Sequence, residues 1–155
     1  MLQQPLYSLF IRMIPEAFFV LLSICLLTSS EINYKNIAKA SVIGGTCVYL
    51  IRLMPIHFGV HTVLGTMIYI LLSFKFNNIK LQRAIVGTLI SVILLFISDI
   101  MLFTIYEGVL KLSLEILIGN SLLAVIATLP SLIIYYMMVR IIAYLKEKKF
   151  KNEQN

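Results

Sequence analysis

Long apolar runs separated by short polar segments constrain the fold of this chain more than any other feature of its sequence. A membrane-spanning helix needs about 20 mainly apolar residues, and successive runs here reach or approach that length. The composition agrees, since 60% of the residues are hydrophobic and 13% are charged, whereas soluble domains are about half apolar and about a quarter charged. The sequence therefore predicts an all-α, polytopic integral membrane helical bundle.

Polar and proline-containing breaks divide the chain into five expected transmembrane helices. Their approximate positions are 6–27, 37–54, 60–76, 84–105 and 122–144. Pro55 is expected to end the second helix, because proline lacks a backbone donor and clashes with the preceding turn, and Pro130 is expected to kink the fifth. Residues 1–146 are thus expected to form a single transmembrane domain, followed by a charged tail at 147–155.

The segment between the fourth and fifth helices has a mixed polar and apolar pattern. Residues 108–118 place Lys111 and Glu115 four positions apart among leucines and isoleucines, which suits a short helix lying in the membrane interface. The same alternation also fits a strand, but a lone strand would leave its edge unpaired. We therefore expect an interfacial helix here.

Basic residues are distributed unevenly between the two sides of this expected bundle. The larger group lies near the first turn, the third turn and the C-terminal end: Lys35, Lys39, Lys75, Lys80, Arg83, Arg140, Lys146, Lys148, Lys149 and Lys151. The other side has Arg12, Arg52 and Lys111. By the positive-inside rule, the N-terminus is expected outside and the C-terminus in the cytoplasm. This distribution explains the net charge of +6 without a nucleic-acid partner.

Ionisable residues within or beside the expected helices concentrate on the outer side. The candidate ligand-binding residues are Arg12, Glu16, Arg52, His57, His61 and Asp99. Charged groups inside a membrane usually face the bundle interior, pair with one another and mark functional sites. Arg12 and Glu16 are four residues apart and can pair on one helix face. Asp99 has no cation nearby in the sequence, so its partner is expected from another helix: Arg12, Arg52 or protonated His61.

Three interpretations of these polar residues are open at the level of sequence. They can pair structurally and hold the helices in register, bind a ligand or ion, or carry a proton-coupled step. His57 and His61 have the spacing of a helical metal pair, but metal sites normally need a third and a fourth ligand, and no metal or other cofactor is predicted. Cys25 and Cys47 lie in apolar runs without a histidine at a catalytic spacing. Whether the chain is an enzyme stays uncertain on these grounds, and an enzyme is the least favoured class.

The segments IRMIPEAF (11–18) and IRLMPIHF (51–58) share the pattern I-R-x-x-P-x-x-F. Their expected helices cross in opposite directions, so a simple duplication does not follow, but both arginines end near the same membrane face. Contacts to partners are expected through lipid-facing surfaces where small residues allow close approach. The candidates are Gly44, Gly45, Gly65 and Gly87.

The second of these segments resembles a motif in the N-terminal membrane sensor regions of Firmicute histidine kinases. The pattern R-x-x-P-I-x-F-G-x-H-T is matched by Arg52, Pro55, Ile56, Phe58, Gly59, His61 and Thr62. An early Pro15-Glu16 and a late Leu129-Pro130 fit the same plan. The 155 residues contain no phosphoacceptor or ATP-binding domain. The resemblance therefore implies a free-standing sensing or regulatory module of a bacterial plasma membrane that signals through a partner.

Two functions of different classes follow from these observations. The first is a small sensor or regulatory membrane protein whose outer polar residues bind a ligand or a partner helix. The second is a membrane subunit of a transporter, either substrate-binding or accessory. The expected partners are the lipid bilayer and a membrane or cytoplasmic protein, a kinase or a transporter subunit respectively, with a homo-oligomer as a further possibility.

Overall fold

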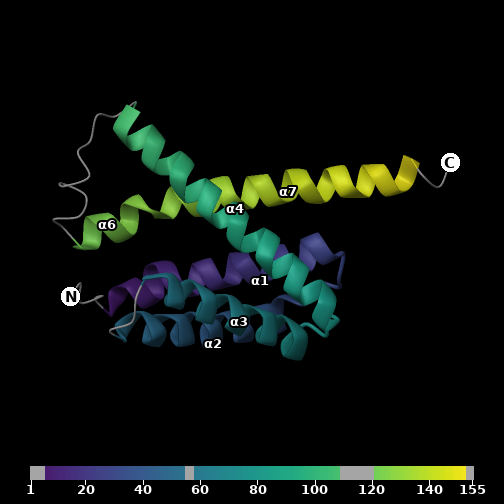
Figure 1. Cartoon of the computed structure of the whole chain (residues 1–155), viewed down its shortest axis with the longest axis horizontal. Helices are drawn as coiled ribbons and strands as arrows, with labels where there is room; N and C mark the ends of the chain where they lie inside the picture. Colours follow the sequence, from purple (N-terminus) through teal and green to yellow (C-terminus); the bar gives the residue numbers. More distant parts are fainter. Residues whose placement is uncertain (1–5, 55–57, 109–120, 153–155) are drawn as a thin grey trace.

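The computed structural model describes residues 6–54, 58–108 and 121–152, and every secondary-structure element in these ranges is a helix. In chain order the elements are the π-helix η1 (Leu9–Met13), α1 (Ile14–Thr28), α2 (Tyr34–Leu53), α3 (Phe58–Phe76), α4 (Leu81–Gly108), α6 (Ser121–Ala127) and α7 (Leu129–Asn152). Figure 1 shows α1, α2 and α3 running side by side, α4 crossing them obliquely, and the two termini at opposite ends of the bundle. The all-α prediction is confirmed.

Four helical segments of the described residues are long and apolar enough to cross a membrane. They are Leu9–Thr28, Gly59–Phe76, Leu81–Gly108 and Val125–Lys146. The sequence predicts five such helices, and the one that is missing from this set is α2, which is 20 residues long. Its length is sufficient, but Lys35, Asn36, Lys39 and Arg52 make it more polar than those four segments. Length and composition thus support a multi-pass membrane protein, with α2 as the least apolar of the five predicted spans.

Local signals account for the helix boundaries. The Asn33 side chain accepts a hydrogen bond from the Asn36 N–H at 3.3 Å, so this N-cap starts α2 three residues before the position predicted. At the other end of α2, Met54 is extended, with ψ at 142°, as expected for a residue that precedes a proline. Pro55 itself and the predicted interfacial helix, apart from Gly108 at the end of α4, lie outside the described residues.

Pro15 explains the π-helix at the start of the first span. In a regular α-helix its ring would clash with the carbonyl of Ile11, and it has no N–H to donate to that carbonyl. The turn just before it is wider, since the Ile14 N–H bonds to the Leu9 carbonyl, five residues back. The sequence predicts a single helix over 6–27, and the structure adds this irregular turn to it.

The predicted irregularity at Pro130 is a break between two helices. α6 ends at Ala127 and α7 begins at Leu129, with Pro130 in the first turn of α7. Across the break the Ser131 N–H bonds to the Thr128 carbonyl at 3.3 Å. Proline is tolerated in a first turn, where its missing N–H would lack an intrahelical partner in any case.

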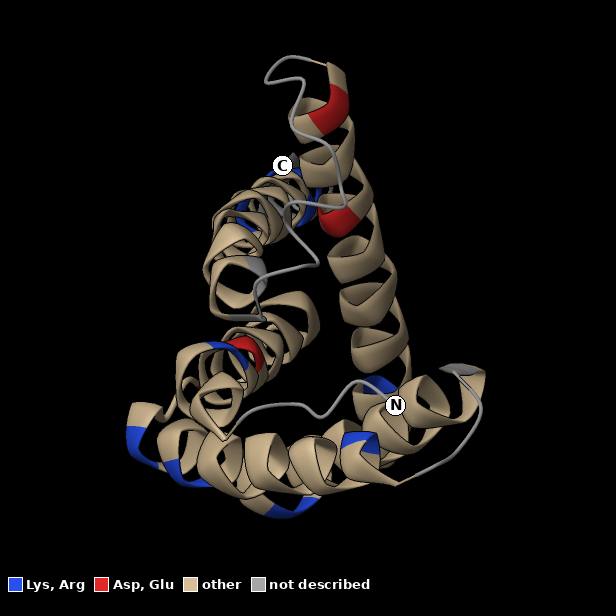
Figure 2. Ribbon diagram, turned by 90° about the vertical axis from the view of Figure 1, so that its left-hand side faces the viewer, with Lys and Arg blue, Asp and Glu red and all other residues tan. Residues whose placement is uncertain are grey.

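The first span is the centre of the bundle, because α1 packs against α2, α3, α4 and α7. Its fully buried apolar residues include Ala17, Val20, Leu21, Ile24 and Cys25. The outward faces of α3, α4 and α7 instead carry many exposed Leu, Ile, Val, Phe and Met side chains. In Figure 2 long stretches of ribbon carry no Lys, Arg, Asp or Glu. This inside-out distribution fits a lipid environment, in which exposed apolar side chains need no burial.

The glycines expected on lipid-facing surfaces lie inside the chain's own helix packing, which corrects that expectation. A Cβ on Gly45 would come 3.0 Å from the Ile14 Cα, and one on Gly87 would come 2.9 Å from the Thr28 Cγ2. A Cβ on Gly44 would lie 2.8 Å from the Leu72 Cδ1. These glycines therefore let α2 and α4 approach α1 and α3 closely, as small residues do between membrane helices.

The tight contact at Gly45 predicts a graded effect of alanine substitution. Gly45→Ala should lower the free energy of unfolding by about 1–3 kcal/mol, because the new methyl group meets backbone that cannot turn away. Gly44→Ala should cost less, since its one close contact is with the flexible end of the Leu72 side chain. The measurement is the unfolding of the purified protein in mixed micelles with increasing denaturing detergent.

Gly65→Ala is the control, because its Cβ would lie at an ordinary 3.7 Å from the Val48 Cγ2 and alanine is favoured over glycine within a helix by up to ~1 kcal/mol. Equal stability of the Gly45→Ala and Gly65→Ala variants would contradict the close contact between α1 and α2.

Candidate functional site

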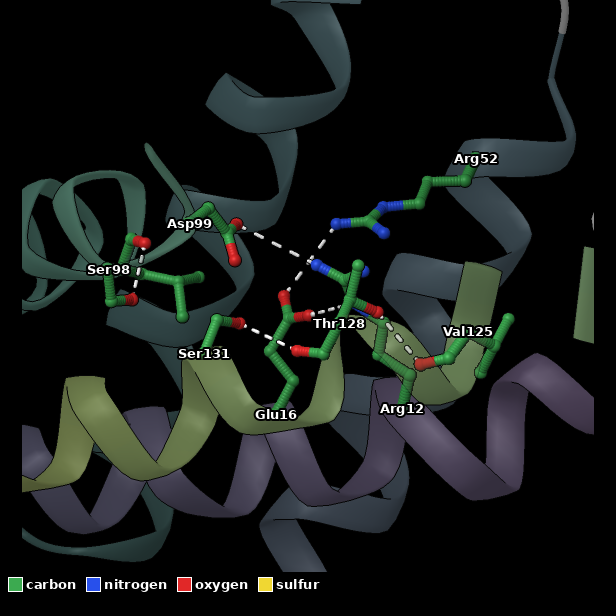
Figure 3. Close-up of polar contacts among 9 residues, drawn as sticks. Arg12, Glu16, Arg52, Ser98, Asp99, Val125, Thr128 and Ser131 are labelled. Carbon is green, nitrogen blue, oxygen red and sulfur yellow. Dashed lines mark hydrogen bonds and ion pairs between the residues drawn. The ribbon is translucent and has the colours of Figure 1, made fainter. Parts of the chain in front are cut away.

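Four charged side chains from three of the predicted spans meet at one end of the bundle, and we call them the four-charge cluster: Arg12, Glu16, Arg52 and Asp99. Arg12 lies in η1 and Glu16 in the first turn of α1, while Arg52 lies in the last turn of α2 and Asp99 in α4. Figure 3 shows the four side chains pointing toward one another.

Glu16 is the centre of the cluster. Its side chain is only 5% exposed, yet it contacts two cations. The Arg12 Nε donates to one carboxylate oxygen at 3.3 Å, and the Arg52 Nη2 lies 3.7 Å from the other. A buried carboxylate is costly unless it is paired and hydrogen-bonded, so each arginine offsets the desolvation of Glu16.

Asp99 completes the charge balance. Its Oδ2 lies 3.7 Å from the Arg12 Nη2, so Arg12 contacts both carboxylates. The cluster then holds two positive and two negative side chains, with no net charge. The partner that Asp99 was expected to find on another helix is Arg12, one of the three candidates named from the sequence.

The two contacts that join different spans are the loosest in the cluster. Both are 3.7 Å long, whereas a charge-assisted hydrogen bond between N–H and a carboxylate is about 2.7–2.9 Å. Asp99 and Arg52 are also the more exposed members, at 24% and 32%. These two residues therefore form the accessible edge of the cluster.

The repeated I-R-x-x-P pattern explains how two arginines reach one carboxylate. Each arginine stands three residues before a proline, Pro15 or Pro55. Arg12 lies in the π-turn next to Pro15, and Arg52 lies in the last turn before α2 ends. Both side chains leave their helices at points where the regular α-helix is interrupted, and both converge on Glu16.

The two histidines complete the set of predicted site residues. His61 lies half-buried in α3, close to the start of that helix. His57 lies outside the described residues. Within the part of the chain that is described, no group of three or more His, Cys, Asp and Glu side chains is arranged to hold a metal ion.

The helix break at Thr128 lies beside the cluster, since α6 packs against η1 and α7 packs against α1. Figure 3 draws Thr128 and Ser131 next to Glu16. The freed backbone carbonyls have local partners: the Ser131 Oγ donates to the Thr128 carbonyl at 2.8 Å, and the Tyr106 hydroxyl donates to the Ala127 carbonyl at 2.6 Å. Tyr106 thus ties the end of α4 to the break. No sequence signal marks it, because its partner is a main-chain atom 21 positions away.

Buried hydroxyl groups continue the contact between α4 and α7 away from the cluster. The Ser91 Oγ and the Tyr135 hydroxyl share a hydrogen bond, and both residues are fully buried. Ser98, one position before Asp99, is also fully buried and donates to the Leu95 carbonyl at 2.7 Å. Small hydroxyl residues at a helix interface permit close packing and hydrogen bonding in a membrane.

Comparison with protein-family models, with curated proteins and with solved structures found no match for this chain.

The burial of Glu16 predicts that removing its charge lowers the free energy of unfolding far more than removing the charge of Asp99. Glu16→Gln should lower the free energy of unfolding by about 3–5 kcal/mol, because it leaves two partly buried arginines without their shared counter-charge. Asp99→Asn should cost about 1 kcal/mol or less, since Asp99 forms one long, partly solvated pair. Unfolding in mixed micelles measures both values.

Glu107→Gln is the matched control, because Glu107 is an exposed carboxylate on the same helix as Asp99 and surface changes usually stay within about 0.5 kcal/mol. If Glu16→Gln unfolds no more easily than Glu107→Gln, the ion pairs do not stabilise the bundle.

Proposed function

We propose that this chain is a small multi-pass membrane protein of sensor or regulatory type, in which the four-charge cluster binds a ligand or a partner helix. The observation that carries this proposal is the asymmetry of the cluster. A buried carboxylate lies between two arginines, while the pairs that connect separate spans are long and involve Asp99 and Arg52, which are partly exposed. A purely structural network would gain most from short, enclosed pairs between helices.

A charged ligand would compete with the ion pairs of the cluster. An anionic group that approaches Arg12 or Arg52 competes with the carboxylates of Asp99 and Glu16, and a cationic group approaches Asp99 in the same way. When the Arg12–Asp99 pair separates, an ion pair between η1 and α4 is lost. A ligand shifts the balance between two such arrangements only by the difference in its affinity for them.

A path for the response leads from α4 to α7. Tyr106 and Ser91 on α4 bond to Ala127 and Tyr135 across the interface, so a displacement of α4 acts on both sides of the break at Thr128. α7 then runs to the opposite end of the bundle, where the Lys146 Nζ donates to the Leu27 carbonyl at 2.7 Å. We propose that a partner protein reads the position of this end of α7.

The proposed orientation places the cluster outside and the end of α7 in the cytoplasm of a bacterium. The hydrogen bonds from Lys146 to Leu27 and from Asn36 to the Phe76 carbonyl bring the ends of α7, α1, α2 and α3 to one side of the bundle. The lysines of these ends favour the cytoplasm by the positive-inside rule. If α2 crosses the membrane as well as the four apolar segments, the chain crosses five times and its two termini lie on opposite sides of the membrane.

Orientation is tested by cysteine labelling in intact cells with a membrane-impermeant maleimide. Glu107→Cys, at the end of α4 near the cluster, should be labelled well above the level of the wild-type protein. Lys149→Cys, near the end of α7, should be labelled only after the cells are opened. Both side chains are exposed in the structure, so access to reagent depends on the side of the membrane. The reverse labelling pattern would overturn the orientation.

Signalling through α7 is tested by photocrosslinking from Tyr144, which is 65% exposed on α7, in cells that make the protein naturally. We expect an adduct with a signalling partner whose yield changes several-fold in Asp99→Asn and Arg52→Gln. Glu107→Gln, the control, should leave the yield unchanged.

Equal yields in all three variants, each folded, would show that the cluster is structural and would overturn the proposal. An adduct with the ATPase subunit of a transporter would also contradict a sensor and would favour the transporter-subunit function raised by the sequence.

A further inference from the structure

A groove of about 570 Å³ lies at the end of the bundle opposite the four-charge cluster. It is formed by the C-terminal end of α1, the N-terminal turns of α4 and the C-terminal half of α7. Among the described residues that line it, Arg83 and Lys146 are cations and none carries a carboxylate. The groove is therefore a cationic recess between three helices.

The cationic side of the groove is built from fixed and exposed groups. The Lys146 Nζ is held by the Leu27 carbonyl at 2.7 Å and the Ser29 Oγ at 3.4 Å, which places its charge at the C-terminal end of α1. Arg83 and Gln82 add donors from the first turn of α4. A guanidinium and an ammonium at one recess form a suitable site for a phosphate group.

The other side of the groove is apolar and faces outward. Val86 and Ile90 follow Arg83 at helical spacing on α4, and Val86 is 57% exposed. Gly87 lies between them, and a Cβ there would meet the Thr28 Cγ2 at 2.9 Å. This glycine therefore lets α1 and α4 meet along the groove that both helices line. Polar and apolar walls thus adjoin at the end of helices long enough to span a bilayer.

We propose that this groove binds an anionic phospholipid. Its phosphate headgroup contacts Arg83 and Lys146, and the first part of an acyl chain packs against Val86 and Ile90. The occupant is chosen by charge complementarity, since a recess with two cations and no carboxylate favours a net negative headgroup over a zwitterionic one. Basic pockets between membrane helices bind anionic headgroups for this reason. The inference does not depend on what the four-charge cluster binds.

The test is the thermal stability of the full-length protein in a neutral detergent, titrated with phosphatidylglycerol or phosphatidylcholine. Phosphatidylglycerol should raise the melting temperature in a saturable manner, and phosphatidylcholine should have little effect. Arg83→Gln should weaken the apparent affinity for phosphatidylglycerol about five- to tenfold, as loss of one cation near an anionic headgroup implies. Gln82→Glu should weaken it as well, because it adds a negative charge to the groove while both cations remain.

Lys80→Gln and Lys149→Gln are the matched controls. Each removes one positive charge from an exposed lysine at the same end of the bundle but outside the groove, and each should change the apparent affinity less than twofold. Inorganic phosphate and soluble glycerol phosphate, which lack acyl chains, should not raise the melting temperature.

Three results would overturn the proposal. Equal weakening by Arg83→Gln and the two lysine controls would show general attraction to a basic surface. An equal response to phosphatidylcholine would show that the headgroup charge is not recognised. A full response to inorganic phosphate would show that the site holds a free anion and not a lipid.

Discussion

The buried carboxylate of Glu16 is the constraint on which the arrangement of this bundle depends. A charge that is 5% exposed in the first turn of the central helix must be paired, and the two arginines that pair with it come from η1 and from the end of α2. This requirement sets the position of η1 over α1 and brings the last turn of α2 to the same level. The two arginines carry one more charge than Glu16 balances, and the carboxylate of Asp99 on α4 balances the second. The need to pair one buried carboxylate thus brings charged residues of three spans together at one end of the molecule.

The helix interruptions concentrate at the end of the bundle that holds the four charges. The π-turn before Pro15, the end of α2 before Pro55 and the break before Pro130 all lie near the cluster. Proline prevents a regular helix from satisfying every backbone group, and side chains such as Tyr106 and Ser131 compensate locally. At the opposite end, Lys146 satisfies the Leu27 carbonyl of α1. The bundle therefore has a charge-paired, interrupted end and a basic end, each linked to α7.

Much of this could be predicted from residues whose effect is local or periodic. Apolar runs predicted the helical class, Pro130 the irregularity in the last span, and the spacing of Arg12 and Glu16 their pairing. The weaker predictions were those in which packing against other helices competes with local pattern. The glycines of α2 and α4, expected to face lipid, are used for close contact within the chain, because close packing against α1 and α3 requires their small volume. Pro15 disfavours a regular turn before it, but the prediction of one helix over 6–27 did not include the π-turn. The contact from Tyr106 had no recognisable signal, since its partner is a backbone carbonyl such as any sequence carries.

The sequence by itself determined the helical, membrane-compatible nature of this protein, the approximate ends of its helices and the set of charged residues that need partners, because these follow from composition, periodicity and the chemistry of proline. Only the tertiary structure decided which charges meet. Arg12 is shared by Glu16 and Asp99, and Arg52 turns to Glu16 and not to Asp99. These choices depend on how helices distant in sequence cross and rotate against each other. The groove between α1, α4 and α7 arises for the same reason, since its cations lie more than 60 residues apart in the chain and gather only when those helices pack.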